Sequence, residues 1–176
     1  IDDIALTILG PEEPDLTLRQ GRILFERNIP LMVDPGQVIA AFSRDQIREL
    51  LKIARYLVIN HHEFEVLKTN GGLTDEEVFG QVPEVVLTRG DKGVAIYSGG
   101  GICHVDAVPD VKVDEVTGCG DAFRAGYAYG IVNKLNLAER GQAGCIMAAR
   151  NLENPETQRY RITATELDAL RTTIYG

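Results

Sequence analysis

Residues 117–126 read T-G-C-G-D-A-F-R-A-G, and this run sets two glycines and a carboxylate where an apolar segment begins a helix. Backbone N–H groups at a helix N-terminus have no intrahelical partner and lie at the positive end of the helix dipole. They therefore stabilise an anion without any Lys or Arg, and glycine lets the backbone approach that anion closely. The run predicts a phosphate-binding helix start.

The carboxylate of Asp121 stands beside the same N–H groups. A carboxylate in this place accepts a proton from a hydroxyl while the N–H groups neutralise charge on a transferring phosphoryl group. The reaction that this suggests is phosphoryl transfer to an alcohol. Asp and Gly are also common helix-start residues, so a structural start with no ligand would look similar. No G-x-x-x-x-G-K-[ST] motif occurs in the chain, and Phe123 breaks G-x-G-x-x-G.

Composition limits the class of protein. The 176 residues, 44% of them hydrophobic, are enough for one core of ordinary size. The net charge of −8 argues against nucleic acid or an anionic membrane surface as a partner. The three cysteines form no C-x-x-C pair, which is typical of a reducing cytoplasm, and no apolar run approaches the roughly 18 residues of a membrane span. We expect a single cytoplasmic α/β domain over residues 1–176.

The hydrophobic pattern alternates between short apolar runs and amphipathic stretches. It predicts a doubly wound, mostly parallel sheet with helices on both faces, interrupted by a small antiparallel flap around Gly99–Gly101. The phosphate-binding run follows the flap, at the end of the sheet where ligands collect in such folds. The predicted strands are 4–9, 31–33, 56–59, 84–88, 94–97 and 102–105, and the predicted helices are 15–27, 44–54, 63–68, 74–79, 122–134, 137–151 and 165–173.

The run at 117–126 resembles a signature of the ribokinase-like, or PfkB, family of carbohydrate and nucleoside kinases, D-[TP]-T-G-x-G-D-[AS]-F-x-x-G. The resemblance implies that Asp121 is the catalytic base and that the amides of Gly118, Cys119 and Gly120 form the anion hole. The resemblance also implies that Thr117, the first residue of the matching run, contacts the nucleotide. The chain departs from the pattern one and two residues earlier, where Glu115 and Val116 replace Asp and Thr or Pro. This departure leaves the local loop geometry open.

A second segment, Asn60-His61-His62-Glu63, is similar to the N-x-x-E motif of the same family. The resemblance implies that Asn60 and Glu63 support Mg²⁺ and the phosphates, and a carboxylate acting mostly through water suits that ion. The same spacing is also that of a capping box, which satisfies free N–H groups at a helix start. From the residues alone, the cap is the favoured reading.

A third segment, 88–93, reads T-R-G-D-K-G and resembles the family's T-[KR]-G-x-x-G. The resemblance implies that Thr88, Arg89 and Gly90 contact the nucleotide. Without a ligand, the same residues describe a strand end and a polar turn.

Three further residues are candidates for a role at the site. Arg124 lies three residues after Asp121 on the expected helix, where it pairs with that carboxylate, reaches a phosphate or is solvated. Asp34 follows a strand, at a position where family members often carry an Asp near the nucleotide. Alternatively, it holds its own turn through an Asx-type hydrogen bond. The helix start at Cys119 is a place where a thiol pKa is lowered.

The resemblance implies an ATP-dependent kinase, closest to adenosine-kinase-like members, that phosphorylates a primary hydroxyl of a sugar or nucleoside such as ribose or adenosine. ATP and Mg²⁺ are the implied cofactors, with K⁺ and a homodimer as family habits. The chain matches the C-terminal, nucleotide-binding part of the family, so we expect a piece of a longer kinase that lacks the N-terminal lid region. The alternative is a non-catalytic nucleotide-binding or assembly module of the same fold, although such a module needs no carboxylate at Asp121. An NAD-linked oxidoreductase lacks its glycine fingerprint.

Overall fold

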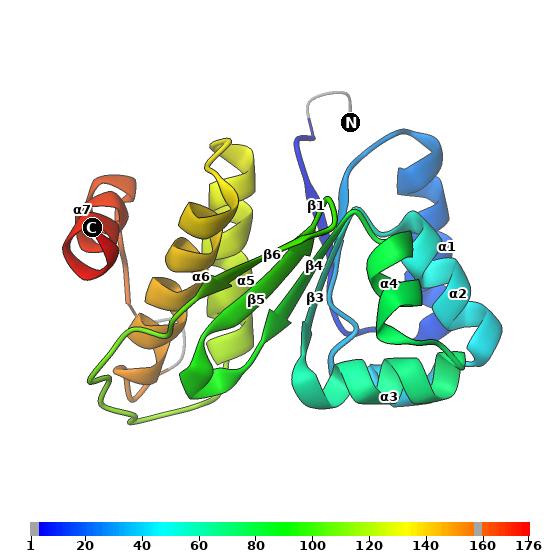
Figure 1. Cartoon of the computed structure of the whole chain (residues 1–176), viewed down its shortest axis with the longest axis horizontal. Helices are drawn as coiled ribbons and strands as arrows, with labels where there is room; N and C mark the ends of the chain where they lie inside the picture. Colours follow the sequence, from blue (N-terminus) through cyan, green and yellow to red (C-terminus); the bar gives the residue numbers. More distant parts are fainter. Residues whose placement is uncertain (1–3, 157–159) are drawn as a thin grey trace. The chain divides into compact units, whose positions relative to one another are not determined.

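The fold is that of a computed structural model, which describes residues 4–156 and 160–176 (Figure 1). One six-stranded sheet has the order β1-β2-β3-β4-β5-β6. Its strands are β1 (Thr7–Leu9), β2 (Leu31–Val33), β3 (Tyr56–Asn60), β4 (Glu84–Thr88), β5 (Val94–Ser98) and β6 (Gly101–Val105). The helices are α1 (Pro14–Glu26), η1 (Gly36–Ala41), α2 (Arg44–Ile53), α3 (His61–Gly71), α4 (Asp75–Gln81), η2 (Gly90–Lys92), α5 (Cys119–Val132), α6 (Leu137–Leu152) and α7 (Ala164–Tyr175).

The first four strands pair in parallel, each with the next. Parallel strands are joined by crossovers that cover the sheet with helices, so their residues are apolar on both faces. All three residues of β2 are buried, and so are Val85, Val86 and Leu87 of β4. β5 and β6 add the antiparallel hairpin, and Gly99 and Gly100, with φ of 58° and 78°, make its turn. The predicted α/β fold with a mostly parallel sheet is confirmed.

The chain forms two compact units. The first contains Ile1–Arg89 and Ala95–Ile102, and the second contains Gly90–Val94 and Cys103–Gly176. Each unit has its own cluster of buried apolar side chains and is described by itself. The expectation of one domain over residues 1–176 stays a prediction.

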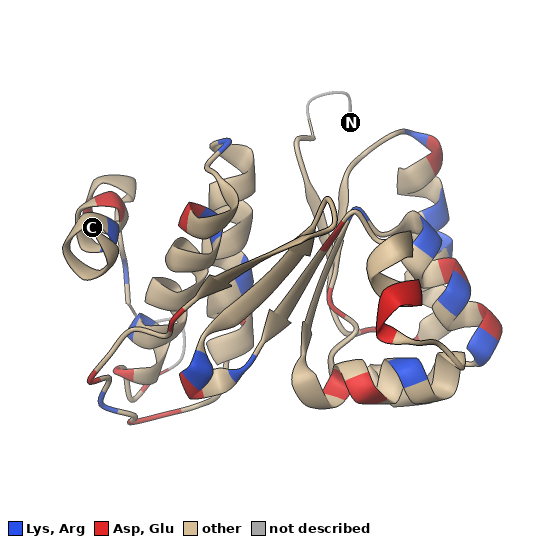
Figure 2. Ribbon diagram, viewed as in Figure 1, with Lys and Arg blue, Asp and Glu red and all other residues tan. Residues whose placement is uncertain are grey.

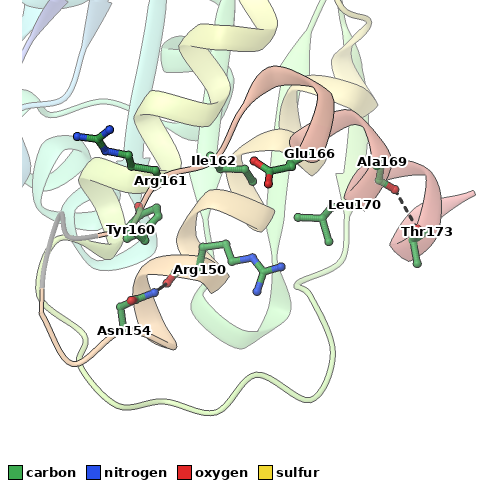
Figure 3. Close-up of a pocket in the computed structure, with 9 residues that line it drawn as sticks. All are labelled: Arg150, Asn154, Tyr160, Arg161, Ile162, Glu166, Ala169, Leu170 and Thr173. Atoms are coloured by element: carbon green, nitrogen blue, oxygen red, sulfur yellow. Dashed lines mark hydrogen bonds between the residues drawn. The ribbon is translucent and has the colours of Figure 1, made fainter.

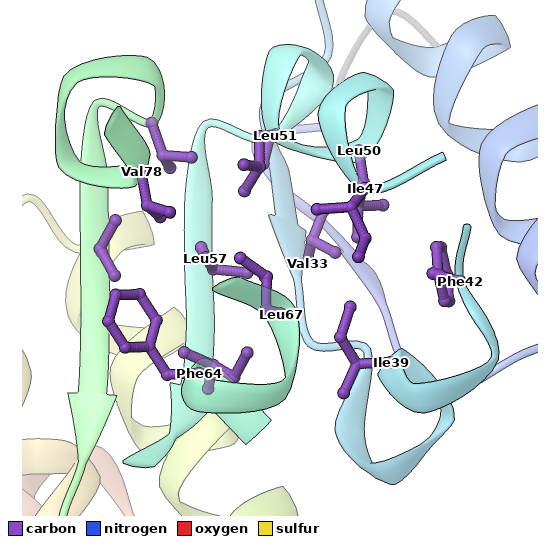
Figure 4. Close-up of a cluster of buried hydrophobic side chains, with 14 of the residues drawn as sticks. Val33, Ile39, Phe42, Ile47, Leu50, Leu51, Leu57, Phe64, Leu67 and Val78 are labelled. Atoms are coloured by element: carbon purple, nitrogen blue, oxygen red, sulfur yellow. The ribbon is translucent and has the colours of Figure 1, made fainter. Parts of the chain in front are cut away.

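The core of the first unit lies between its strands and the helices α2 and α3 (Figure 4). α2 contributes Ile47, Leu50 and Leu51, which recur at the helical period and are all fully buried. Leu57 of β3 and Leu67 of α3 meet them in the same cluster. Burying this apolar stripe is what holds the helices on the sheet, because it removes their hydrophobic surface from water.

Charged residues occupy the solvent side of the first unit. Acidic and basic side chains are interspersed along α1 and α2 (Figure 2), and Arg22 of α1 forms an ion pair with Glu49 of α2. Such exposed pairs contribute little to stability. The interspersed signs leave no broad positive field on these two helices, so an anion would depend on local groups.

The second unit is built on the packing of α5 against α6, and of α6 against α7. Glycines bring α5 and α6 close: a Cβ added at Gly126 would lie 2.4 Å from the Ala143 carbonyl oxygen, and one added at Gly144 would lie 2.6 Å from the Phe123 ring. Backbone atoms in such contact leave no room for a side chain. Gly130 also permits close packing, since a Cβ added there would lie 3.0 Å from the Cα of Arg140.

Element boundaries differ from the sequence prediction in a few places. The first strand covers Thr7–Leu9 rather than 4–9, and residues 1–3 lie outside the described part. α3 begins at His61, because Asn60 is its N-cap, and continues to Gly71 before Gly72 ends it at a φ of 58°. The two short 3₁₀ helices were not predicted. In residues 4–156 and 160–176, no helix combines the length and the apolar character needed to cross a membrane.

We predict that Gly126→Ala lowers the free energy of unfolding by about 1–3 kcal/mol, since the added methyl group collides with backbone rather than with a flexible side chain. Urea denaturation of the full-length protein measures the change. Gly80→Ala is the matched control, because nothing lies within 4 Å of its added Cβ, and it should be neutral or slightly stabilising in helix α4. Equal free energies for the two variants would contradict the packing argument.

Candidate functional site

The start of α5 is a tight turn with glycine at its critical position. Gly118 is the N-cap residue and has φ 80° and ψ 0°. The Cys119 amide donates to the Val116 carbonyl at 3.3 Å. A positive φ at the third residue and a hydrogen bond from the fourth residue to the first are features of a type II turn, and this φ favours glycine. The turn therefore needs the first glycine of the run.

This helix start differs from the others in the described part of the chain. Glu13 caps α1 through its side chain, and five helices have reciprocal capping boxes. Among the described α-helices, only α5 has no side-chain cap, because its N-cap is glycine. The N–H groups at its first turn therefore face no side chain of the N-cap residue, as an anion site requires. The five boxes are Ser43/Gln46, Asn60/Glu63, Thr74/Glu77, Asn136/Glu139 and Thr163/Glu166.

Asp121 stands three residues after the N-cap, where a capping box has its Glu or Gln. Gly118 offers no side chain to complete a box, and the Asp121 carboxylate forms an ion pair with Arg124 instead. The Asp121 side chain is 64% exposed, whereas that of Arg124 is 12% exposed. Burial lowers the pKa of Arg124. Of the three readings of Arg124, the structure has the pairing, and it leaves the carboxylate accessible to a hydroxyl substrate.

The loop before the turn is ordered by Glu115, which replaces the family's leading Asp. Its carboxylate accepts hydrogen bonds from the Thr117 amide at 2.9 Å and the Thr117 hydroxyl at 2.8 Å. These two bonds lower the pKa of Glu115, which keeps it ionised. The departure at this position therefore preserves a carboxylate that bonds to the motif's threonine.

The thiol of Cys119 behaves differently from the expectation for a helix N-terminus. Burial raises the pKa of Cys119 rather than lowering it. Desolvation penalises the thiolate and is the cause of this shift. The Cys119 amide, one of the three expected in the anion hole, is directed to the Val116 carbonyl.

A second group of predicted residues lies in the first unit, where β3 and β4 end side by side. Asn60 and Thr88 are register partners in the parallel pair, so their strands end at the same edge of the sheet. The capping box is present: the Asn60 side chain accepts from the Glu63 amide at 2.9 Å, and the Glu63 carboxylate accepts from the Asn60 amide at 3.2 Å. The reading as a cap is confirmed. Arg89 follows Thr88 directly in the sequence, just after the end of β4.

The glycines that follow Arg89 have backbone reasons to be glycine. Gly90 has a φ of 60° and begins η2, in the second unit. Gly93 has a φ of 71°, and a Cβ there would lie 2.1 Å from the Val105 carbonyl oxygen. Asp34 also has a local role, because its carboxylate accepts from the Gly36 amide at 2.8 Å in an Asx-type turn.

The donors that could hold a metal are few. In residues 4–156 and 160–176, no group of three or more His, Cys, Asp or Glu side chains could hold an ion by itself. One carboxylate and one amide at the end of β3, Glu63 and Asn60, fit Mg²⁺, which usually keeps several waters and binds one or two carboxylates plus substrate phosphates. The residues present are therefore compatible with Mg²⁺ brought by a nucleotide.

One hollow of about 450 Å³ opens in the second unit, between the end of α6 and α7 (Figure 3). None of the residues predicted for catalysis, nucleotide or metal lines it. Its lining is Arg150, Asn154, Tyr160, Arg161, Ile162, Glu166, Ala169, Leu170 and Thr173. The hollow therefore has no part in the site argued here.

We predict that Cys119 is alkylated more slowly than a free cysteine at neutral pH, and that its rate still rises as the pH passes the ordinary thiol pKa. The reason is its raised pKa, which leaves less thiolate at a given pH. Burial raises the pKa of Cys145 to about 12, so Cys145 should stay unlabelled in the folded protein. Mass spectrometry of iodoacetamide-treated protein over a pH series measures both. A Cys119 rate that levels off below the pKa of a free thiol would contradict the expectation.

Comparison with known proteins gives one consistent result. Residues 17–163 match the family described as pfkB family carbohydrate kinase. A nucleoside kinase of Methanocaldococcus jannaschii is 26% identical over 137 residues, which cover 78% of this chain and 45% of the relative.

Solved structures agree with the sequence relatives. The nucleoside kinase of Burkholderia thailandensis in complex with inosine is 31% identical, with a TM-score of 0.95 over 100% of this chain and 59% of that chain. Its complex with ADP-inosine has the same identity and TM-score and is covered over 55% of its length. The chain spans about half the length of the curated relatives it matches. The chain belongs to the pfkB family of carbohydrate kinases.

Proposed function

We propose that this protein transfers the γ-phosphoryl group of ATP to the primary hydroxyl of a nucleoside. The observation that carries the proposal is the start of α5, where a glycine N-cap leaves the first N–H groups without a side-chain cap and an exposed carboxylate stands in the same turn. The structural relative at 31% identity is a nucleoside kinase in complex with inosine and with ADP-inosine. A nucleoside is therefore preferred over a free sugar as the acceptor.

Asp121 is the proposed base. Its carboxylate accepts the proton of the acceptor hydroxyl as that oxygen forms a bond to the γ-phosphorus and the bond from phosphorus to the ADP oxygen breaks. The ion pair with Arg124 orients the carboxylate before the substrate arrives. The amides of Gly118, Cys119 and Gly120 are the proposed donors to the phosphoryl oxygens, where negative charge increases in the transition state. The Cys119 amide would have to exchange the Val116 carbonyl for the phosphoryl oxygen, whereas those of Gly118 and Gly120 would not.

The nucleotide contacts and the metal belong to the same proposal. Thr88, Arg89, Gly90, Thr117 and Asn60 are proposed to contact the nucleotide. Glu63 is proposed to support Mg²⁺ through water. When bound, Mg²⁺ supplies positive charge that offsets the charge on the phosphates. K⁺ activation, a homodimer and a cytoplasmic location stay predictions from the family resemblance.

The test of the function is ADP release by the full-length protein with MgATP and a panel of inosine, adenosine, ribose and fructose. We expect turnover with a nucleoside, and Asp121→Asn should lower kcat by about 10²- to 10⁴-fold, because the amide cannot take the proton. The KM for MgATP should change little. Asp168→Asn, an exposed Asp of α7, is the control and should keep full activity. Turnover that survives Asp121→Asn would contradict the assigned base, and no turnover with any acceptor would contradict the proposed kinase.

The role of Glu63 is separable from its role in the cap. We predict that Glu63→Gln raises the Mg²⁺ concentration needed for half-maximal turnover, while thermal stability is kept, because Gln also completes a capping box, as Gln46 does in α2. Glu77→Gln makes the same change in the capping box of α4 and is the control. If both variants show the same Mg²⁺ dependence as the wild type, Glu63 has only its structural role.

A further inference from the structure

Asn151 is a buried polar residue in the last turn of α6. The residue is only 2% exposed. A buried amide is costly unless it forms hydrogen bonds, so its partner matters. Its Nδ2 donates to the carbonyl oxygen of Thr117 at 2.8 Å, across 34 residues of sequence. Asn151 therefore connects the end of α6 to the phosphate-binding run.

The Thr117 carbonyl lies in the peptide whose direction matters most. Thr117 and Gly118 are the two central residues of the turn from Val116 to Cys119. Type I and type II turns differ mainly in the direction of this central peptide. The described residues contain no cis peptide bond. In a trans peptide the N–H of Gly118 points opposite to the Thr117 carbonyl, so a donor that holds the carbonyl also sets the direction of the Gly118 amide.

The other bonds to this loop hold different peptides. The Leu152 carbonyl accepts from the Asp114 amide at 2.8 Å and from the Glu115 amide at 3.3 Å. The Glu115 carboxylate accepts from the Thr117 amide, which belongs to the peptide before the central one. These bonds fix the path of the loop as it reaches the turn. The bond from Asn151 acts on the central peptide itself.

We propose that Asn151 is a positioning residue that orients the Gly118 amide toward the transferring phosphoryl group by holding the Thr117 carbonyl. This inference rests on the proposed function, because it assigns the cause of the anion hole's geometry. Asn151 lies in a different helix from the residues that would touch the phosphate, and it acts on them through the backbone.

The test compares Asn151→Asp and Asn151→Ala in the full-length protein. Ionised aspartate turns an acceptor toward the Thr117 carbonyl and repels it, so kcat should fall by about 10- to 100-fold near pH 8. Protonated aspartate regains a donor, and burial raises the pKa of such a carboxyl. The ratio of the Asn151→Asp kcat to that of wild type should therefore rise as the pH falls toward about 6. Asn151→Ala has no donor at any pH, so its ratio should be low and nearly flat.

The controls separate this inference from folding defects and from the function itself. Asn154→Asp makes the same change three residues later, where Nδ2 donates to the Arg150 carbonyl within α6, and should keep wild-type kcat. Glu115 titrates in the same loop in both Asn151 variants, so a pH effect that it causes would be common to both. If Asn151→Asp does not fold, the kcat of Asn151→Ala decides the question. Calorimetry of MgADP binding then shows that Asn151→Ala is folded and keeps its nucleotide site.

Two results would overturn the proposal while the kinase activity stands: wild-type kcat in Asn151→Ala, or identical pH profiles for the two variants. A wild-type protein that neither releases ADP nor binds MgADP would overturn the proposed function as well.

Discussion

The left-handed backbone of Gly118 is the constraint on which the candidate site depends. A φ of 80° favours glycine, and glycine has no side chain to cap the helix that it begins. The six other α-helices in the described residues are each capped by a side chain of the N-cap residue. At α5, the absence of a side-chain cap and the absence of a capping box at Asp121 both follow from one residue without a side chain. The features that make the turn possible are therefore the same features that make an anion site.

The position of Asp121 shows how a common helix signal takes on another use. In five helices the third helical residue is Glu or Gln, which reaches back to the N-cap amide. Asp121 occupies this position in α5, where the side chain is one methylene shorter than Glu and the N-cap is glycine. Its carboxylate pairs with Arg124, one turn along the helix. An exposed carboxylate held by one ion pair, rather than by a cap, is accessible to a proton donor from solvent or substrate.

Much of the fold follows from the sequence because its signals are local. The apolar run at Leu31–Val33 and the helical stripe of Ile47, Leu50 and Leu51 need only neighbouring residues to be read. The capping box at Asn60 and Glu63 is local in the same way, and the structure has it. The interactions that escaped prediction join distant segments: Asn151 meets Thr117 across 34 residues, and the Tyr175 hydroxyl donates to the Asp106 carbonyl across 69. No periodicity or spacing carries such information.

Electrostatic character was also beyond the sequence, for a related reason. A helix start predicts a lowered pKa for Cys119, yet burial in the folded chain raises it. For Glu63, by contrast, the structural role as a helix cap and the proposed role as a support for Mg²⁺ do not compete. An ionised carboxylate has two oxygens and about four acceptor positions, and the cap uses Oε2 for the Asn60 amide. Acceptor capacity remains for water of a metal's hydration shell. A residue that caps its own helix can therefore also support a metal. Substitution by Gln separates the two roles, because Gln removes the charge of the carboxylate and keeps the capping box.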